Sequence, residues 1–338
     1  MNENQIEKLT QYYNHNYPKR QNQTISDVKE ITDGWETKLY KYTVNYILNE
    51  NPVSDHQVIR IFSDHGGPTS EKEFQVMMML GEQRYPVPEV FHNDSTGDVI
   101  NKPFIIMEYL SGNTMNYRYD NVSDSEREEL YRQMITLMVD LHRINVSKVF
   151  PDNKLSDTDE FFDFMFNQID ERIAWTKLDW VYPIVDWLQE RRNDVKTHEL
   201  SVLHGDFHGR NIMFRGDRTP AVIDWSGSNV GDYRFDLAWT IILFSTFGGS
   251  FFRDLLLNMY SDVSEVEIKD IEYFEVLGCA VRFVIVFSSF LNKPDEMGLR
   301  SKSDKMTTVI SDHFLKVYDM LVKRTGLRLP EFEKIMST

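Results

Sequence analysis

Two carboxylates and one amide in the middle of the chain have the spacing that phosphoryl-transfer chemistry requires. Four residues separate Asp206 from Asn211 in the run His204-Gly205-Asp206-Phe207-His208-Gly209-Arg210-Asn211, and Ile223-Asp224-Trp225 follows it. Phosphoryl transfer needs a carboxylate that orients the acceptor hydroxyl and takes its proton, and oxygen ligands that hold Mg²⁺ against nucleotide phosphates. We therefore expect Asp206 to be the catalytic base and Asn211 and Asp224 to bind magnesium.

Apolar segments around these residues predict the elements that position them. Three segments have the length and composition of short buried strands: Val202-Leu203, Ile212-Met213-Phe214 and Ala221-Val222-Ile223. Such strands would carry the two acids and the amide to one rim. Each polar residue alone also has a structural interpretation, with His204-Gly205-Asp206 as a solvated turn and Asp224 as a helix cap.

The order His-Gly-Asp-Phe-His-x-x-Asn, then Ile-Asp-Trp, resembles the aminoglycoside and macrolide phosphotransferase family, a branch of the protein-kinase-like superfamily related to choline kinase. The resemblance extends over roughly residues 24–290 and is densest at 202–240. It implies a two-lobe α+β fold, with an antiparallel-sheet N-terminal lobe containing one main helix and a mostly helical C-terminal lobe. We expect residues 1–110 to form the nucleotide-binding lobe and residues 111–338 the catalytic and substrate-binding lobe.

Alternating apolar and polar residues predict an antiparallel meander near the N-terminus, at residues 24–31, 38–48 and 58–62. Two further strands, 86–91 and 103–110, are expected on either side of a turn. The resemblance implies that the loop around Gly34 covers the nucleotide phosphates with its backbone N–H groups. An ordinary hairpin turn at Gly34 is the alternative.

Arg60 is a single charge in the apolar strand at 58–62, where it needs a partner. The resemblance implies that Arg60 binds the α- and β-phosphates and pairs with Glu73, which lies on a helix predicted at about residues 70–83. The alternative is an edge-strand arginine in solvent.

The segment Met107-Glu108-Tyr109-Leu110, followed by Ser111-Gly112, resembles the family's hinge between lobes. The resemblance implies that the Glu108 C=O and the Leu110 N–H bind the adenine edge. Because backbone groups would do the binding, an ordinary core strand is also compatible with these residues.

The C-terminal part reads as helical, beginning with a capping box at Ser123 and Glu126. Residues 151–198 alternate aromatic and acidic side chains, which fits either amphipathic helices packed on the lobe or a substrate wall. The segment Gly231–Trp239 resembles a family motif, with Tyr233 in place of the usual proline. The resemblance implies that Asp236 caps a helix beginning at Leu237 and braces the catalytic loop, and His204 is assigned a supporting role as well.

Composition narrows the classes of function. The chain has 37 Lys and Arg against 53 Asp and Glu, a formal charge of −16. Such an acidic chain is not expected to bind nucleic acid, because that requires clustered basic residues. The acidic excess serves either solubility or the attraction of cationic substrates.

Cys279 is the only cysteine, which excludes an intrachain disulfide. The first residues lack the pattern of a secretory leader, and the apolar stretch Thr240–Phe252 is shorter than the ~20 residues that span a bilayer. We expect a cytoplasmic protein without a membrane partner, and the sequence leaves the oligomeric state open.

These residues together predict a Mg²⁺-dependent kinase that uses ATP or GTP to phosphorylate a hydroxyl of a small molecule. The acceptor could be an aminoglycoside or macrolide, and choline, a sugar or an amino alcohol is also open. Three other classes compete with this hypothesis: a nucleotide-binding regulator without catalysis, a protein kinase, and a metal hydrolase using His204 and His208. The absence of Asp-Phe-Gly and Ala-Pro-Glu after Asp224 argues against a protein kinase.

Overall fold

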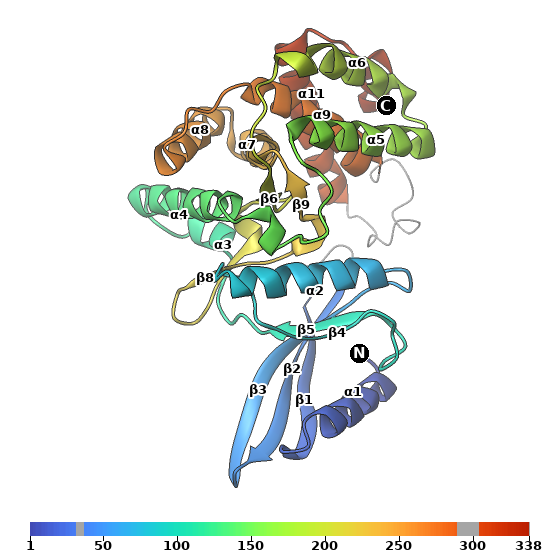
Figure 1. The fold of residues 1–338 in the computed structure, drawn as a ribbon, viewed down its shortest axis with the longest axis vertical. Coiled ribbons are helices and arrows are strands. Elements are labelled where there is room, and N and C mark those ends of the chain that lie inside the picture. Colours follow the sequence, from blue (N-terminus) through green and yellow to red (C-terminus); the bar gives the residue numbers. More distant parts are fainter. Residues whose placement is uncertain (32–36, 289–303, 338) are drawn as a thin grey trace. The chain divides into compact units, whose positions relative to one another are not determined.

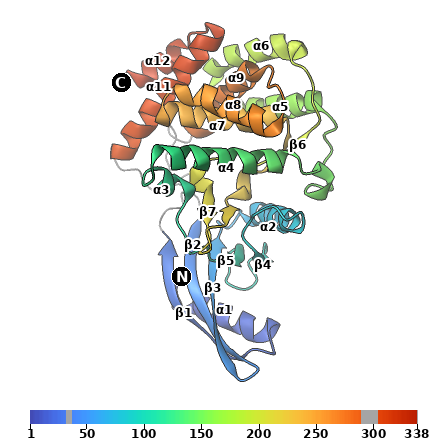
Figure 2. The same ribbon diagram turned by 90° about the vertical axis from the view of Figure 1, so that its left-hand side faces the viewer.

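The chain divides into two compact units in a computed structural model that describes residues 1–31, 37–288 and 304–337 (Figures 1 and 2). The first unit is Met1–Met115 together with Ile212–Ser226, and the second is Asn116–Asn211 together with Gly227–Thr338. The sequence-based division at residue 110 differs from this one, because it assigned 212–226 to the C-terminal lobe.

The first unit is built on a five-stranded antiparallel sheet with strand order β1-β2-β3-β5-β4. The predicted meander is confirmed, although β4 begins only at Val90 and the preceding residues are not in a strand. The elements are α1 (Glu3–Asn16), β1 (Gln21–Ile31), β2 (Lys38–Leu48), β3 (Asn51–Ile61), α2 (Gly67–Glu82), β4 (Val90–Asp94) and β5 (Phe104–Glu108).

Strand β3 connects the core of this unit with helix α2. Ile59 and Ile61 belong to a buried cluster that also contains Leu9 and Tyr13 of α1. Since successive side chains of a strand point to opposite faces, Arg60 points away from that cluster. There it meets Glu73 of α2, so one strand carries both an apolar core face and a buried charge.

Residues 212–226 join the first unit through a short hairpin of β7 (Ile212–Phe214) and β8 (Pro220–Val222). Met213 forms a bridge with Thr114, and the Val222 N–H donates to the Pro86 carbonyl at 2.8 Å. Arg215 at the hairpin's end binds Glu108 of β5, with both nitrogen–oxygen distances at 2.8 Å. These contacts are non-local, so no local sequence pattern predicts them.

The second unit is mostly helical, and its described strands form the two-stranded sheet β6–β9. Together with the family resemblance tested below, this arrangement confirms the predicted fold class. Its elements are α3 (Met115–Tyr119, which begins at the boundary), α4 (Asp124–His142), α5 (Thr158–Thr176), α6 (Tyr182–Arg191), β6 (Ser201–Leu203), β9 (Asn229–Gly231), α7 (Tyr233–Gly248), α8 (Phe251–Ser264), α9 (Ile271–Val281), a π-helical turn (Arg282–Phe287), α11 (Asp304–Thr325) and α12 (Pro330–Met336).

Helix α7 is the central element of this unit, because it packs on α8, α9, α11 and β6 (Figure 1). Its residues from Arg234 to Ile242 are all buried, which suits a helix that is covered on every side. The capping box predicted at Ser123 and Glu126 is present at the start of α4.

Most aromatic residues of the segment 151–198 serve helix packing. Phe161, Phe162 and Phe166 of α5 are buried, and Trp180 packs edge-on against Phe283 at 5.7 Å between ring centroids. Trp175 differs, because it is 60% exposed. The packing interpretation therefore holds for the buried rings, and a substrate wall at this segment stays a prediction.

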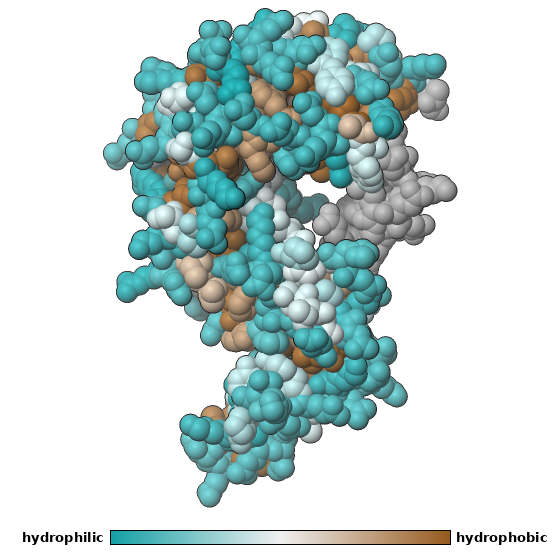
Figure 3. All heavy atoms as spheres, turned by 45° about the vertical axis from the view of Figure 1, so that its right-hand side comes forward, coloured by the Kyte–Doolittle hydropathy of each residue, from teal (hydrophilic) through white to brown (hydrophobic). Residues whose placement is uncertain are grey.

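Hydrophilic side chains cover most of the face drawn in Figure 3, with hydrophobic residues scattered between them. This distribution fits a chain with a formal charge of −16. None of the helices in the described part of the chain has the length and apolar character needed to cross a bilayer.

The start of α7 depends on a buried ion pair. Asp232 caps the helix by accepting from the Arg234 N–H, and its carboxylate also binds the Arg234 guanidinium at 2.6 Å. Both side chains are fully buried. The guanidinium also donates to the carbonyls of Lys196 and Lys269, so every contact of this buried charge is with the protein.

We expect Asp232→Ala to lower the free energy of unfolding by about 3 kcal/mol, because it removes the helix cap and leaves the Arg234 charge without its main partner. Denaturant unfolding of both proteins measures the change. Asp254→Ala on α8 is the control, since the Asp254 side chain is 80% exposed and should change stability by no more than about 0.5 kcal/mol. Equal effects of the two substitutions would contradict this interpretation of the ion pair.

Candidate active site

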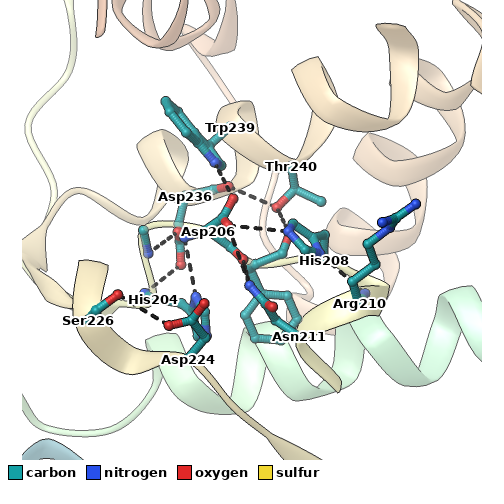
Figure 4. A network of polar contacts seen from close by, with 12 residues as sticks. His204, Asp206, His208, Arg210, Asn211, Asp224, Ser226, Asp236, Trp239 and Thr240 are labelled. Carbon is teal, nitrogen blue, oxygen red and sulfur yellow. Dashed lines mark hydrogen bonds and ion pairs between the residues drawn. The ribbon is translucent and has the colours of Figure 1, made fainter. Parts of the chain in front are cut away.

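The loop that follows β6 carries the first part of the candidate site, Asp206 to Asn211 (Figure 4). Gly205 turns the chain directly after the strand, with φ at +81°. A Cβ atom at this position would lie 2.5 Å from the Gly227 carbonyl oxygen, so a larger residue would collide with backbone. Residues Gly209–Asn211 then form a short 3₁₀ turn.

One face of helix α7 holds this loop. Asp236 accepts hydrogen bonds from the His204 and Gly205 N–H groups, both at 2.9 Å. Trp239 donates to Asp206 at 2.9 Å, and the Thr240 hydroxyl donates to the Phe207 carbonyl at 2.7 Å. Positions separated by three and four residues share a face of a helix, so side chains on one face of α7 hydrogen-bond to the loop.

The prediction that Asp236 caps a helix beginning at Leu237 is wrong. The helix begins at Tyr233, and Asp232 is its cap. Asp236 instead lies inside the first turn, fully buried, where it binds the loop and the His142 Nε2 at 3.3 Å. Burial raises the pKa of Asp236, but the hydrogen bonds and charges of His142 and His204 outweigh it and hold the pKa below its ordinary value.

Asp206 is held as an ionised carboxylate by its neighbours. The Arg210 N–H donates to the His208 Nδ1, so in the neutral imidazole the proton is on Nε2, which donates to Asp206 Oδ2 at 3.2 Å. Desolvation raises the pKa of Asp206, yet the hydrogen bonds from His208 and Trp239 and the charge of Arg282 bring it below its ordinary value. The side chain is still 46% exposed, which leaves the carboxylate accessible to a substrate.

His204 and Asn211 support the same carboxylate. The Asp206 N–H donates to the His204 Nδ1 at 3.2 Å, which fits the supporting role assigned to His204. Asn211 donates from Nδ2 to the Asp206 carbonyl at 2.9 Å. This orientation uses the amide nitrogen and keeps the amide oxygen, the atom type that Mg²⁺ prefers, for a ligand.

The first unit carries the other predicted charged residues. Arg60 donates from Nη1 to Glu73 at 2.6 Å, the pairing that the sequence predicts, and to Asp224 at 3.0 Å, a contact that the sequence did not indicate. Its Nε also donates to the Thr37 hydroxyl at 3.0 Å. Asp224 has a positive φ of +67° and is 43% exposed, so its carboxylate could serve as a metal ligand.

Burial raises the pKa of Glu73 to about 7, with the nearby charge of Asp224 acting in the same direction and Arg60 opposing both. Glu73 is only 1% exposed. The charge on this residue therefore depends on its neighbours near neutral pH. A cation at Asp224 would favour the ionised form of Glu73.

The remaining predicted nucleotide-binding residues are placed as follows. Glu108 is the last residue of β5, and its side chain binds Arg215. Leu110 follows two residues later and is buried. Gly34 lies outside the described residues.

Four residues that the structure places around these sites were not singled out from the sequence. The sequence could have indicated Trp239 and Thr240, because they follow Asp236 by three and four positions and so share its face of a helix. It could also have indicated Arg282, as the single charge in the apolar run Val276–Phe287. It did not indicate Arg215, since its partner Glu108 is distant in the chain.

The described residues contain no group of three His, Cys, Asp or Glu side chains arranged to hold a metal ion. A zinc-type site would need such a group, whereas Mg²⁺ is commonly held by one or two protein ligands plus substrate phosphates. Asn211 in the second unit and Asp224 in the first each offer an oxygen donor of the kind that Mg²⁺ binds, so the chemistry of each side chain suits that metal.

A family model decides the classification. Residues 27–267 match the model of the phosphotransferase enzyme family. The chain belongs to this family. The predicted family and the prediction of a phosphotransferase enzyme are thereby confirmed.

Curated relatives match only over part of their length. A protein of Arabidopsis thaliana assigned as an acyl-CoA dehydrogenase, IBR3, is 28% identical over 186 residues, which are 50% of this phosphotransferase and 22% of the relative. Across three such relatives the matched part is between 17% and 22% of their length. The names of these much longer proteins therefore describe more than the segment they share with this chain.

Solved structures show the same fold over nearly the whole chain. An aminoglycoside phosphotransferase assigned in Ralstonia eutropha is 16% identical, with a TM-score of 0.69, covering 95% of this phosphotransferase and 98% of that chain. The aminoglycoside phosphotransferase APH(4)-Ia, in a ternary complex with ADP and hygromycin B, is 13% identical with a TM-score of 0.58 and covers 95% and 99%. At these identities the likeness concerns the fold.

The raised pKa of Glu73 predicts a pH-dependent contribution to stability. Below about pH 4.5, the ordinary value, its carboxyl is protonated in both the folded and the unfolded chain. Between there and about pH 7 the folded chain binds more protons, so the contribution falls as pH rises. Glu73→Gln lacks this titration.

Urea unfolding at about pH 5 and about pH 8 should show the wild type losing stability relative to Glu73→Gln as pH rises. Glu82→Gln, at the exposed end of the same helix, is the control and should follow the wild type. A wild type that gains stability relative to Glu73→Gln over this range would contradict the raised pKa.

Proposed function

We propose that the chain is a Mg²⁺-dependent small-molecule kinase that transfers the γ-phosphate of ATP or GTP to a hydroxyl group. The observation that carries this proposal is the state of Asp206. Its carboxylate is ionised at neutral pH, fixed by hydrogen bonds from Trp239 and His208, and nearly half exposed. The chain belongs to a family of phosphotransferases, and in phosphoryl transfer such a carboxylate can orient the acceptor hydroxyl and accept its proton.

In this proposal Asp206 accepts a hydrogen bond from the acceptor hydroxyl and orients its oxygen toward the γ-phosphorus. As the new oxygen–phosphorus bond forms and the bond to the nucleoside diphosphate breaks, the hydroxyl proton passes to Asp206. The products are a phosphate monoester and the diphosphate. Since the protein takes little part in covalent chemistry, positioning and charge neutralisation provide the rate.

Asn211 and Asp224 would hold the magnesium ion through their side-chain oxygens. When bound, Mg²⁺ neutralises charge on the nucleotide phosphates. Arg60, fixed by Glu73, would bind the α- and β-phosphates, and its planar fork suits phosphate oxygens. The Glu108 C=O and the Leu110 N–H would bind the adenine edge, and the Gly34 loop would cover the phosphates.

The acceptor is the least determined part of this proposal. Related folds have been crystallised with ADP and hygromycin B, and one, LicA, with AMP, while the curated relatives carry the name of acyl-CoA dehydrogenases. Hygromycin B is an aminoglycoside, whereas ADP and AMP are nucleotides and the name of the dehydrogenases specifies no hydroxyl acceptor. Aminoglycosides, macrolides, choline, sugars and amino alcohols therefore all belong in a first screen. A kinase needs access to ATP or GTP, so the proposal includes a cytoplasmic location.

Asp206→Asn should abolish phosphoryl transfer, because the amide cannot take the acceptor proton, while nucleotide affinity stays within about twofold. Release of ADP with an active acceptor and calorimetric binding of ATP with Mg²⁺ measure the two properties. The control is Asp186→Asn on α6, an exposed acid. A regulator without catalysis would show binding in all proteins and transfer in none. Wild-type turnover in Asp206→Asn would sink the assignment of the base.

Trp239→Phe should raise the pKa of Asp206, because it removes the N–H that donates to Oδ1. Since the reaction needs ionised Asp206, the acid side of the pH profile of kcat/KM should move to higher pH, while Asp206 stays ionised near neutral pH and the loss of activity there is much smaller than at the acid side. Trp187→Phe on α6, whose ring stacks on Tyr273, is the control. An unchanged acid limb in Trp239→Phe would show that this hydrogen bond does not set the pKa.

A further inference from the structure

Arg282 is a buried charge with no counter-ion within hydrogen-bonding distance among the residues that the structure describes. It is the first residue of the π-helical turn Arg282–Phe287 and is only 4% exposed. Its Nε is buried without a hydrogen-bond partner, and within the described ranges none of its nitrogens bonds or ion-pairs with another residue. Buried polar groups without partners are rare in folded proteins and call for an explanation.

The same unit shows how a structural buried arginine is satisfied. Arg234, with 0% of its side chain exposed, binds the Asp232 carboxylate and two backbone carbonyls. Arg282 has neither kind of contact with any part of the chain that the structure describes. Burial lowers the pKa of Arg282 to about 10, so it is still a cation near neutral pH. A cation left in this way inside a protein is costly unless an anion reaches it.

Arg282 lies beside the proposed catalytic base. Its guanidinium carbon is 4.1 Å from the centre of the Trp239 ring, and the N–H of that same ring donates to Asp206 at 2.9 Å. The charges of Arg282 and Asp206 act on each other. Among the described residues no hydrogen bond or ion pair joins Arg282 to Asp206, whose oxygens accept from Trp239 and His208 and keep further lone pairs for a substrate.

We propose that Arg282 binds an anionic group, a carboxylate or phosphate, on the acceptor whose hydroxyl Asp206 orients. This inference rests on the proposed function and narrows its acceptor class. A guanidinium offers two parallel N–H donors that match the oxygens of either anion. Since one indole ring connects the two residues, the hydroxyl and the anionic group of the acceptor are separated by a few covalent bonds.

The net charge of −16 suggests that the chain attracts cations, whereas the proposed acceptor is an anion. The field of exposed charges is screened beyond about 8 Å at physiological salt, whereas a buried guanidinium next to the reacting groups acts directly on the bound molecule. Contact with buried Arg282, more than the net charge of the chain, therefore decides whether the acceptor is anionic or cationic. Polycationic aminoglycosides should then be poor acceptors.

The first test is calorimetric binding of hydroxy acids to the full chain, using glycerate and 3-hydroxybutyrate with glycerol and butane-1,3-diol as their uncharged counterparts. The wild type should bind the acids at least about tenfold more tightly than the diols, and Arg282→Gln should lose that preference while Arg282→Lys retains part of it. The matched control is Arg191→Gln, because Arg191 also stacks on a tryptophan ring but is 43% exposed. A wild type that binds acids no better than diols overturns the proposal.

Steady-state kinetics then show whether the anion that Arg282 binds belongs to the acceptor or to the nucleotide. With an anionic acceptor, Arg282→Gln should raise the KM of the acceptor by about tenfold or more and leave the KM of ATP unchanged. A rise in the KM of ATP alone would mean that Arg282 meets the nucleotide phosphates, and a fall in kcat alone would mean that it acts only through Trp239 and Asp206. Either result overturns the inference.

Two further readouts keep the outcomes distinct. If Arg282→Gln does not fold, as judged by its thermal unfolding, the comparison is made with Arg282→Lys, whose point charge should bind the acids more weakly than the guanidinium. If the wild type binds hydroxy acids through Arg282 but transfers no phosphate to any compound, the proposed kinase function fails and the anion site stands. If it phosphorylates hygromycin B and no hydroxy acid, the kinase function stands and the anion site fails.

Discussion

The loop that carries Asp206 is held by one face of helix α7. Asp236, Trp239 and Thr240 each bind a different atom of residues 204–207, and the three share a face because they are three and four positions apart. The helix is buried from Arg234 to Ile242 and begins at the Asp232–Arg234 ion pair. The position of Asp206 is therefore set by a rigid element in the centre of its unit, which is where a catalytic carboxylate is best held.

Three buried acids of the candidate site have pKa values that are shifted in different directions. In the second unit, hydrogen bonds to Asp206 and Asp236 hold both pKa values below the ordinary range despite desolvation. In the first unit, burial raises the pKa of Glu73 to about 7 although Arg60 lies at 2.6 Å. Burial is the main cause of the raised pKa of Glu73, and the charge of Asp224 adds to it, so that Arg60 and the Trp225 N–H do not offset the two. These surroundings agree with the proposed roles, in which Asp206 is an ionised base and Glu73 holds Arg60.

The sequence predicted the fold well because the relevant signals are local. Alternation in residues 38–48 gave β2 with its observed bounds, and Ser123 with Glu126 gave the start of α4. The pairing of Arg60 with Glu73 was also accessible, since a charge in an apolar strand needs a partner and the following helix offers an acid. The family resemblance added the roles of these residues, which spacing alone could not assign.

Contacts between segments that are distant in the chain could not be predicted from local sequence patterns. The hairpin at 212–226 joins the first unit through Thr114, Pro86 and Glu108, and no periodicity in the hairpin indicates these partners. The helix cap was assigned to Asp236, whereas the helix begins one turn earlier, at Tyr233, and Asp232 is its cap. Arg282 carried a visible signal, but its proximity to Asp206 through Trp239 appears only in the folded chain.

Phosphorus NMR of the full chain with ATP, Mg²⁺ and a set of small hydroxyl compounds tests the central claim most directly. The resonances of ADP should appear together with that of a new phosphate monoester, in equal amounts, because each transferred γ-phosphate leaves one ADP. ADP accompanied only by inorganic phosphate, or ATP that stays intact with every compound, would contradict the claim that Asp206 directs the γ-phosphate to a hydroxyl acceptor.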